Sequence, residues 1–371
     1  MTLSVRQLSR AAARDAWTAL DAARPPKLAA SWAWTETWLD HYADTVEAEL
    51  VAVEEPGRSA APPLAVALLT VGTERRRGVP VRHAHIGTAG EPQADTVYVE
   101  RNALHAPPER RAEVARALVQ HLQDAGGWDE LRLDGFVPDD AAALAAAPAL
   151  GPAGIELDRK PSPWTDLAAI RAAGGDDVVA ALRSGPRRRV RQTLRAFDGL
   201  ELEWAEDTAT AHAFLDELAT LHQARWTAEG RPGAFSSARF TAFHHAAVAR
   251  LGVAGDQPGA IVVRVRAAGN TTVGCLMAYV DGPDVLFYQS GLARFERSAQ
   301  RAGHAAHALL MQECLQRGYG VYDFLPGEAR YKDELATGEG ELVWGTARAR
   351  HLRARLLSGA AVARRRLSNL G

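Results

Sequence analysis

The chain has 371 residues, of which 47% are hydrophobic and 24% charged, and its formal net charge at pH 7 is −2. This length suggests about two domains, and the balanced charge excludes a protein that binds nucleic acid through overall basicity. The chain has two cysteines, Cys275 and Cys314, which indicates two buried thiols rather than a disulfide framework or a cysteine-rich zinc site. Without a signal-peptide pattern or a run of about 18 apolar residues, we expect a cytoplasmic protein.

Helix-type and strand-type hydrophobic patterns alternate along the N-terminal half. Helices are predicted at residues 14–23, 31–42, 108–125 and 141–147. Strands are predicted at residues 48–54, 63–71, 82–86, 96–99 and 130–133, and residues 155–167 lead into the second half.

The C-terminal half shows a similar order of patterns. A strand at 200–204 precedes a long helix at 208–228 and a second helix that Ser236 or Ser237 can cap and that ends near residue 251. A hairpin at 260–266 and 272–280 leads to a strand at 285–290, a helix from 300 to 317, a buried strand at 319–325, a helix at 328–332 and a last strand at 341–347.

The helix that begins at residue 300 is entered through Gly303. The first turn of a helix has unpaired N–H groups and a positive dipole end, which suit a phosphate or pyrophosphate. The glycine could also serve only to turn the chain into the helix.

The segment Gln300-x-x-Gly303-x-Ala305 resembles the coenzyme A pyrophosphate loop of the GNAT acyltransferase superfamily, and Tyr322-Asp323-Phe324-Leu325-x-Gly327-x-x-x-Tyr331-Lys332 is similar to its CelD-type and FemAB-like branch. Residues 187–197 and Leu221-His222-x-x-Arg225-Trp226 agree with that resemblance. The resemblance covers residues 160–345 and implies a tandem α/β fold. It consists of two GNAT-like domains, each with a mixed, mostly antiparallel sheet flanked by helices.

The implied domains are a degenerate N-terminal copy at 1–160, an acyltransferase domain at 161–347 and a basic tail at 348–371. Pro107, Pro108 and Glu109 stand where the N-terminal copy enters its helix. The prolines lack N–H donors and the glutamate adds negative charge, so this helix start is poor for pyrophosphate. We interpret the N-terminal copy as one wall of an acceptor cleft.

The resemblance implies acetyl-CoA or another acyl-CoA as donor and no metal. The cofactor-binding candidates are Gln289, Ser290, Gln300, Arg301, Gly303, His304 and Ala305. Backbone N–H groups near residues 288–290 would polarise the acyl carbonyl.

The catalytic candidates are Tyr331, Asp323 and Lys332. By position, Tyr331 would protonate the leaving thiolate, Asp323 would act as a base or fix the acceptor, and Lys332 would contact a phosphate, a carboxylate or Asp323. Each has a structural alternative: Tyr331 can pack under the sheet, Asp323 can pair with an arginine, and Lys332 can be solvated.

The acceptor-binding candidates are His222, Arg225, Trp226 and Gly327. His222 and Arg225 share a helix face, and Trp226 offers a stacking surface for a sugar, although a helical histidine is more often structural. His244 and His245 lack metal-ligand spacing and are expected at the surface.

We therefore expect an N-acyltransferase acting on an amine of a sugar, amino acid or envelope-polysaccharide precursor. Five arginines between Arg187 and Arg195 predict a solvated helix face, or contact with tRNA as in FemAB-type enzymes that use aminoacyl-tRNA. The arginines of the tail suggest a partner or peripheral membrane contact. A non-catalytic partner in polysaccharide synthesis is the third alternative.

Overall fold

The computed structural model describes residues 3–57, 62–98, 100–152, 154–255 and 258–349. The predicted basic tail lies outside these residues from position 350 onward. The chain divides into two compact units, one made of Met1–Arg159 with the residues from Leu342 and the other of Lys160–Glu341. None of the described helices is long and apolar enough to span a bilayer.

The N-terminal unit has a sheet whose strand order is β1-β2-β3-β4-β5-β12. Its strands are β1 (Ser4–Gln7), β2 (Glu47–Glu54), β3 (Ala65–Arg76), β4 (Val79–Ile86), β5 (Glu130–Phe136) and the end of β12 (Gly338–Arg348). Its helices are α1 (Arg10–Ala23), α2 (Trp32–Tyr42), α3 (Arg111–Ala125) and α4 (Pro138–Ala145), with a 3₁₀ turn at Pro108–Arg110 before α3. Leu118, Val119 and Leu122 of α3 belong to the apolar core that the sheet residues form with this helix.

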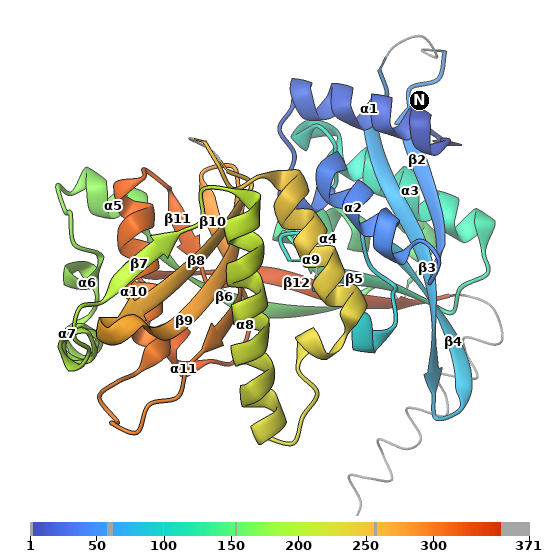
Figure 1. Cartoon of the computed structure of the whole chain (residues 1–371). Helices are drawn as coiled ribbons and strands as arrows, with labels where there is room; N and C mark the ends of the chain where they lie inside the picture. The colour runs from blue at the N-terminus through green and yellow to red at the C-terminus, as the bar shows by residue number, and fades with distance from the viewer. Residues whose placement is uncertain (1–2, 58–61, 99, 153, 256–257, 350–371) are drawn as a thin grey trace, which may run out of the picture. The chain divides into compact units, whose positions relative to one another are not determined.

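The second unit has a sheet with the order β6-β11-β10-β9-β8-β7. Its strands are β6 (Glu156–Asp166), β7 (Glu201–Trp204), β8 (Ala260–Ala267), β9 (Thr271–Asp281), β10 (Asp284–Leu292) and β11 (Val321–Asp323). Its helices are α5 (Leu167–Ala172), α6 (Val178–Ala181), α7 (Ser184–Ala196), α8 (Thr208–Ala228), α9 (Ala238–Leu251), α10 (Ala302–Gln316) and α11 (Arg330–Leu335). Figure 1 shows α8 in front of strands β8 to β10, with α10 behind them.

Both sheets repeat one pattern of strand directions. In the N-terminal unit the β4–β5 pair is parallel and its other recorded pairs are antiparallel, and in the second unit β10–β11 is the parallel pair. Each parallel pair is joined by a connection that contains one long helix, α3 in the first unit and α10 in the second. The predicted tandem of mixed, mostly antiparallel α/β units is confirmed by this repetition.

Local sequence explains the helix boundaries. Asp207 accepts a hydrogen bond from the N–H of Thr210 at the start of α8, and Ser237 accepts one from Phe240 at the start of α9. Such caps satisfy donors that have no partner inside the helix. Ser237, one of the two predicted capping residues, is therefore the cap.

Two sequence-based expectations were wrong. Residues 96–98 of the predicted strand at 96–99 form no strand; instead the N–H of Val97 donates to the Glu91 carboxylate, 2.7 Å away. The second error concerns His244, which is fully buried rather than at the surface, with Nδ1 2.6 Å from the Tyr279 hydroxyl. This polar partner makes burial of the imidazole possible.

Candidate functional site

Strand β10 changes register in the middle of the second unit's sheet. Opposite β9, the partners shift between Phe287 and Gln289, so Tyr288 occupies a bulge. On the other edge, the parallel pairing with β11 covers two positions, Val285 with Tyr322 and Leu286 with Asp323. The recorded β10–β11 pairing therefore ends before the bulge at Tyr288.

Helix α10 starts downstream of that strand without a side-chain cap. The N–H groups of Ala302, Gly303 and His304 lie in its first turn and have no carbonyl partner within the helix. A Cβ added to Gly303 would meet one atom within 4 Å, the Leu292 Cδ1 at 3.3 Å. Gly303 is therefore not required by backbone strain, and its N–H group lies in the uncapped first turn.

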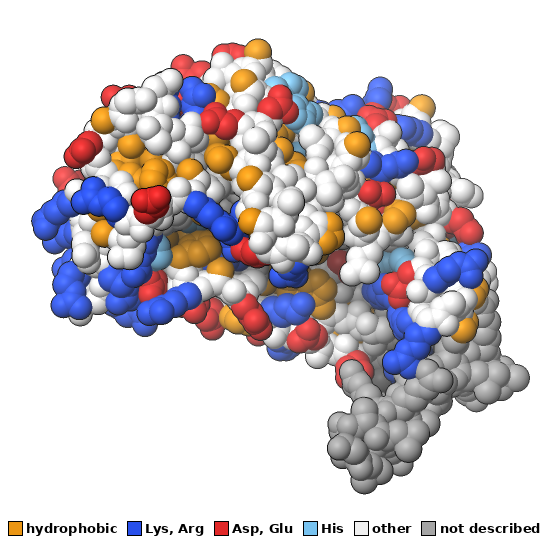
Figure 2. Space-filling view, turned by 60° about the horizontal axis from the view of Figure 1, so that its bottom comes forward, with side chains coloured by type: hydrophobic (Ala, Val, Ile, Leu, Met, Phe, Trp, Pro, Cys, Tyr) orange, Lys and Arg blue, Asp and Glu red, His pale blue; other side chains and the backbone are white. Residues whose placement is uncertain are grey.

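A basic groove of about 660 Å³ adjoins this helix start. Its lining residues come from α7 and the loop before α10: Ser184, Arg187, Arg188, Arg191, Gln192, Arg195, Ala196 and Ala299. The Gln300 side chain donates to the carbonyl of Ala196 over 3.2 Å and so ties that loop to α7. Figure 2 shows Lys and Arg side chains gathered at the left of the view, the side on which α7 lies in Figure 1.

Glu334 of α11 joins the helices around the groove. Its buried carboxylate contacts His304 of α10 at 2.8 Å, Arg189 of α7 at 3.1 Å and Arg330 at 3.0 Å. Burial acts to raise the pKa of Glu334, but the hydrogen bonds and charges of His304 and Arg189 hold this pKa below its usual range. Glu334 was not predicted, because its spacing from His304 and Arg189 in the sequence gives no signal before the helices are packed.

Tyr331 of α11 lies in an aromatic group at the same end of the sheet. Its ring stacks on His307 of α10, with 4.8 Å between centroids, and meets Phe324 edge-on at 6.2 Å. Burial raises the pKa of the Tyr331 phenol, and the positive charge of Arg225 acts weakly in the opposite direction. The hydroxyl therefore stays protonated at neutral pH and can donate a proton.

The turn after β11 is held by two of the predicted residues. Buried Asp323 accepts hydrogen bonds from the Ser162 hydroxyl at 2.7 Å and the Leu325 N–H at 2.8 Å. Lys332 Nζ donates to the carbonyls of Leu325 and Pro326, at 2.9 and 3.0 Å. Leu325 has a φ of 57°, which is unfavourable for a residue with a Cβ, so these contacts stabilise a turn that would otherwise relax.

The predicted acceptor residues of α8 form a second group. His222 Nε2 accepts a hydrogen bond from Trp226 Nε1 over 2.9 Å, and burial lowers the His222 pKa, so this histidine is neutral. The guanidinium of Arg231 lies 4.7 Å from the Trp226 ring centroid. Arg225 is exposed and pairs with Glu229 at 3.3 Å.

The structure thus places the predicted residues in two adjoining parts of one unit. Gln289 and Ser290 follow the bulge, and Arg301 and Ala305 belong to the start of α10. The side chains of Gln300 and His304 already bond to protein groups, so these two residues can contact a ligand through their backbone rather than their side chains. Gly327, with a φ of 135°, lets the chain pass Lys332 Nζ, which an added Cβ would approach to 3.1 Å.

Residues 165–333, which contain the bulge, the α10 start and Tyr331, match the family model of the acetyltransferase (GNAT) domain. This segment is a GNAT-type acetyltransferase domain. The predicted resemblance to that superfamily is therefore confirmed. No protein of curated function matches the sequence significantly.

Solved structures share the fold across most of the chain at low sequence identity. FemX superposes with a TM-score of 0.58 at 11% identity, covering 92% of this chain and 96% of FemX. The C-terminal DUF2156 domain of a protein described as a lysylphosphatidylglycerol synthetase from Agrobacterium fabrum gives 0.50 at 13% identity, covering 95% and 97%. A conserved protein of unknown function from Bacteroides thetaiotaomicron gives 0.51 at 9%, covering 94% and 100%.

Proposed function

We propose that this protein is an acyl-CoA-dependent N-acyltransferase whose acceptor is an amine of a sugar, an amino acid or an envelope-polysaccharide precursor. The observation that supports it most directly is the β10 bulge at Tyr288, which lies beside the short β10–β11 pairing and upstream of an uncapped helix. This arrangement can bind a thioester carbonyl and a pyrophosphate on neighbouring backbone segments.

The donor would be held mainly by backbone and by arginine. N–H groups of residues 302–304 would bind the pyrophosphate, and Arg301 at the start of α10 would add charge-assisted hydrogen bonds. The N–H groups near the bulge would stabilise negative charge on the acyl oxygen. The donor supplies the activated acyl group, and the protein supplies its orientation.

Tyr331 would hold the proton that the leaving thiolate needs. A protonated phenol is a suitable donor to a thiolate of ordinary pKa, and burial keeps the Tyr331 hydroxyl protonated. Asp323 and Lys332 would act through the turn 323–327, which they fix through Leu325. Trp226, with His222 behind it, would offer the stacking surface for the acceptor.

The acyl donor can be tested at Gly303. A Gly303→Asp variant places a carboxylate where phosphates would bind, so acyl-CoA affinity should fall by about 100-fold in isothermal titration calorimetry. Gly303→Ala is the matched control, because its Cβ would meet only Leu292 Cδ1. Unchanged affinity in a folded Gly303→Asp protein would refute the assignment.

An aminoacyl-tRNA donor is the second candidate, and the arginine groove on α7 favours it. The resemblance to FemAB-type enzymes implies such a donor, and a groove lined by Arg187, Arg188, Arg191 and Arg195 could neutralise several backbone phosphates.

Salt dependence separates the two donors. Binding of tRNA should weaken steeply as salt rises, because each neutralised phosphate releases counterions, whereas acyl-CoA binding should change little. Under the acyl-CoA proposal, a double variant with Arg188→Ala and Arg191→Ala keeps most of its turnover. Activity that requires charged tRNA and collapses in this variant would establish the aminoacyl-tRNA-dependent function instead.

A further inference from the structure

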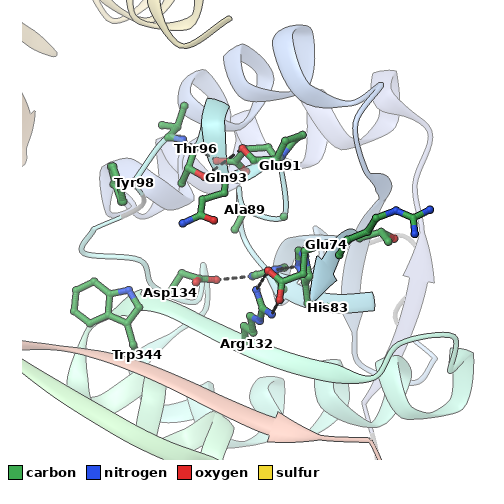
Figure 3. A pocket seen from close by; sticks show the side chains of 16 residues that line it. Glu74, His83, Ala89, Glu91, Gln93, Thr96, Tyr98, Arg132, Asp134 and Trp344 are labelled. Atoms are coloured by element: carbon green, nitrogen blue, oxygen red, sulfur yellow. Dashed lines mark hydrogen bonds and ion pairs between the residues drawn. The ribbon is translucent and has the colours of Figure 1, made fainter. Parts of the chain in front are cut away.

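A polar cavity of about 610 Å³ lies wholly within the N-terminal unit, and none of its lining residues was predicted to be functional. It is bounded by β3, β4, β5, the segment 89–98 and Trp344 (Figure 3). The cavity lies beside the parallel pair β4–β5, which corresponds in strand order to β10–β11 of the second unit.

Three side chains form a hydrogen-bonded chain in this cavity. Asp134 Oδ2 lies 2.5 Å from His85 Nδ1, and His85 Nε2 lies 2.7 Å from His83 Nδ1. His83 and His85 are alternate residues of β4 and therefore project from the same face of the strand. Both imidazoles are buried, and Figure 3 shows the chain running from Asp134 to His83.

The hydrogen-bond roles follow from the carboxylate, because an ionised Asp134 can only accept. With one proton on each imidazole, His85 donates through Nδ1 and presents a lone pair at Nε2. His83 then donates through Nδ1, which leaves its Nε2 as an acceptor for which no partner is recorded among the described residues. His83 lines the cavity, so this acceptor is the one that the chain of hydrogen bonds offers to a ligand.

Charge in the cavity favours a cationic guest. Arg132 bonds to Glu74 and Glu130, and Arg75 is exposed and bonds to the Gly78 carbonyl. Among the residues that the structure describes, Asp134 forms no ion pair with an arginine. Burial opposes ionisation of Asp134, but its contact with His85 and the charge of Arg132 lower its pKa, so the carboxylate is ionised.

Glu91 adds a buried carboxylate to the cavity. It is 7% exposed, and Oε1 accepts from the Val97 N–H. Burial raises its pKa, and hydrogen bonds, including one from the Trp38 side chain, act in the opposite direction. Exposed Tyr98 and half-buried Trp344 provide aromatic surface at the same cavity.

We propose that this cavity is a binding site for a small amine-bearing ligand, whose ammonium group donates a hydrogen bond to His83 Nε2 and whose body rests against Tyr98 and Trp344. His83 is the contact residue, and His85 and Asp134 are positioning residues that set its tautomer. The site rests on the N-terminal unit alone and does not depend on the proposed transferase activity.

Calorimetry on the full chain, with no acyl donor present, tests the site with glucosamine and with glucose as the matched probe lacking the amine. Glucosamine should bind at least about 10-fold more tightly than glucose, since the difference is a charge-assisted hydrogen bond. His83→Gln should abolish that preference. His121→Gln, a change at a half-buried histidine of α3 that pairs with Glu49, should keep it. Equal affinities, an unaffected His83→Gln protein or no binding of either sugar would overturn the proposal.

The tautomer chain has its own test. ¹⁵N chemical shifts of the wild-type protein should place the proton of His83 and that of His85 on Nδ1. Asp134→Ala removes the acceptor that fixes these tautomers and should weaken glucosamine binding. A His83 proton on Nε2 in the wild-type protein would contradict the relay. Glucosamine binding should persist in Gly303→Asp, so failure here and failure of the transferase proposal are distinguishable.

Discussion

At the scale of single residues, the proposed role of the Tyr331 hydroxyl as a proton donor makes the most specific prediction. Its ring stacks on His307, and burial raises the pKa of its phenol. Tyr331→Phe keeps this stacking and removes only the proton donor. We expect kcat with acyl-CoA to fall by about 10²- to 10⁴-fold, the usual contribution of general acid catalysis, with acyl-CoA affinity nearly unchanged.

Steady-state kinetics and calorimetry on the same protein check this expectation. Tyr319→Phe is the matched control, because Tyr319 is a tyrosine of the same unit whose ring belongs to the apolar core. A Tyr331→Phe protein with full kcat would remove the hydroxyl from the mechanism. A loss confined to acyl-CoA affinity would assign it to donor binding instead.

Glu91 makes a prediction about stability and pH. Burial raises the pKa of its carboxyl from 4.5 to about 7, so the folded protein holds this proton more tightly than the unfolded chain. Its contribution to stability is present at low pH and is lost as pH rises from about 4.5 to about 7. Glu91→Gln removes that loss and should stabilise the protein relative to wild type by on the order of 2 kcal/mol near neutral pH, with less advantage in acid.

Thermal unfolding of both proteins across this pH range measures the difference. An advantage of Glu91→Gln that is constant with pH would contradict the raised pKa.

The pKa shift of His83 changes stability in the opposite pH direction. Burial lowers its pKa to about 4, so it costs stability as pH falls below its usual value, equally in wild type and in Glu91→Gln.

At the scale of secondary-structure elements, the contact between α8 and β10 depends on Gly291. A Cβ there would lie 2.2 Å from the Leu218 carbonyl oxygen and 2.8 Å from its Cα. Because both atoms are backbone, the helix must move away from the strand. We expect Gly291→Ala to destabilise the protein by about 2–4 kcal/mol, as overpacking against a rigid neighbour does.

Gly340→Ala is the matched control, since Gly340 is also a strand glycine and its Cβ would meet only the Ser162 carbonyl oxygen at 3.9 Å. Chemical denaturation should show a lower midpoint for Gly291→Ala alone. Similar midpoints for the two variants would mean that α8 adjusts without cost.

Elements with strong periodicity could be predicted from the sequence, and elements set by distant partners could not. Helix α8 has its predicted bounds because its apolar positions recur at helical spacing and Asp207 caps it. The strand predicted at 96–99 is wrong for residues 96–98, because the Val97 N–H bonds to the Glu91 side chain and a hydrophobicity pattern gives no sign of such a contact. Strand β1 (Ser4–Gln7) was not predicted, since it is short, mostly exposed and defined by pairing with β2.

The candidate site residues divide in the same way, into those that a contiguous segment reveals and those that depend on a partner far away in the sequence. The order of strand, glycine, helix, strand and helix located the α10 start and Tyr331, because these lie within one contiguous segment. Glu334 is close to His304 only after α10 and α11 pack. His83 and His85 at alternate strand positions were a visible signal of a shared face, but their partner Asp134 lies 49 positions beyond His85.

At the scale of the whole molecule, one topology occurs twice with different chemistry at its parallel strands. The second unit has a bulge, an uncapped helix start and an arginine groove. The N-terminal unit has buried imidazoles and carboxylates in a cavity beside β4 and β5. Under the two proposals above, the N-terminal copy has exchanged an anion-binding site for a cation-binding one.

The start of α3 explains why a second acyl-CoA should not bind. Pro107 and Pro108 precede this helix and lack N–H groups, and a 3₁₀ turn at Pro108–Arg110 comes first. Arg110 is already bonded to Glu113 and Glu55. By contrast, α10 begins without prolines and beside arginines of α7.

We therefore predict one acyl-CoA per chain, bound in the second unit. Calorimetric titration of the full chain should give a stoichiometry of one, and Gly303→Asp should remove that single transition. Pro108→Gly, which restores one N–H at the start of α3, should leave the stoichiometry unchanged, because Glu109 and Glu113 still place negative charge at this helix start. Two equivalent sites in the wild-type protein would show that the N-terminal unit has kept donor binding, and the proposed exchange of function between the two units would then be wrong.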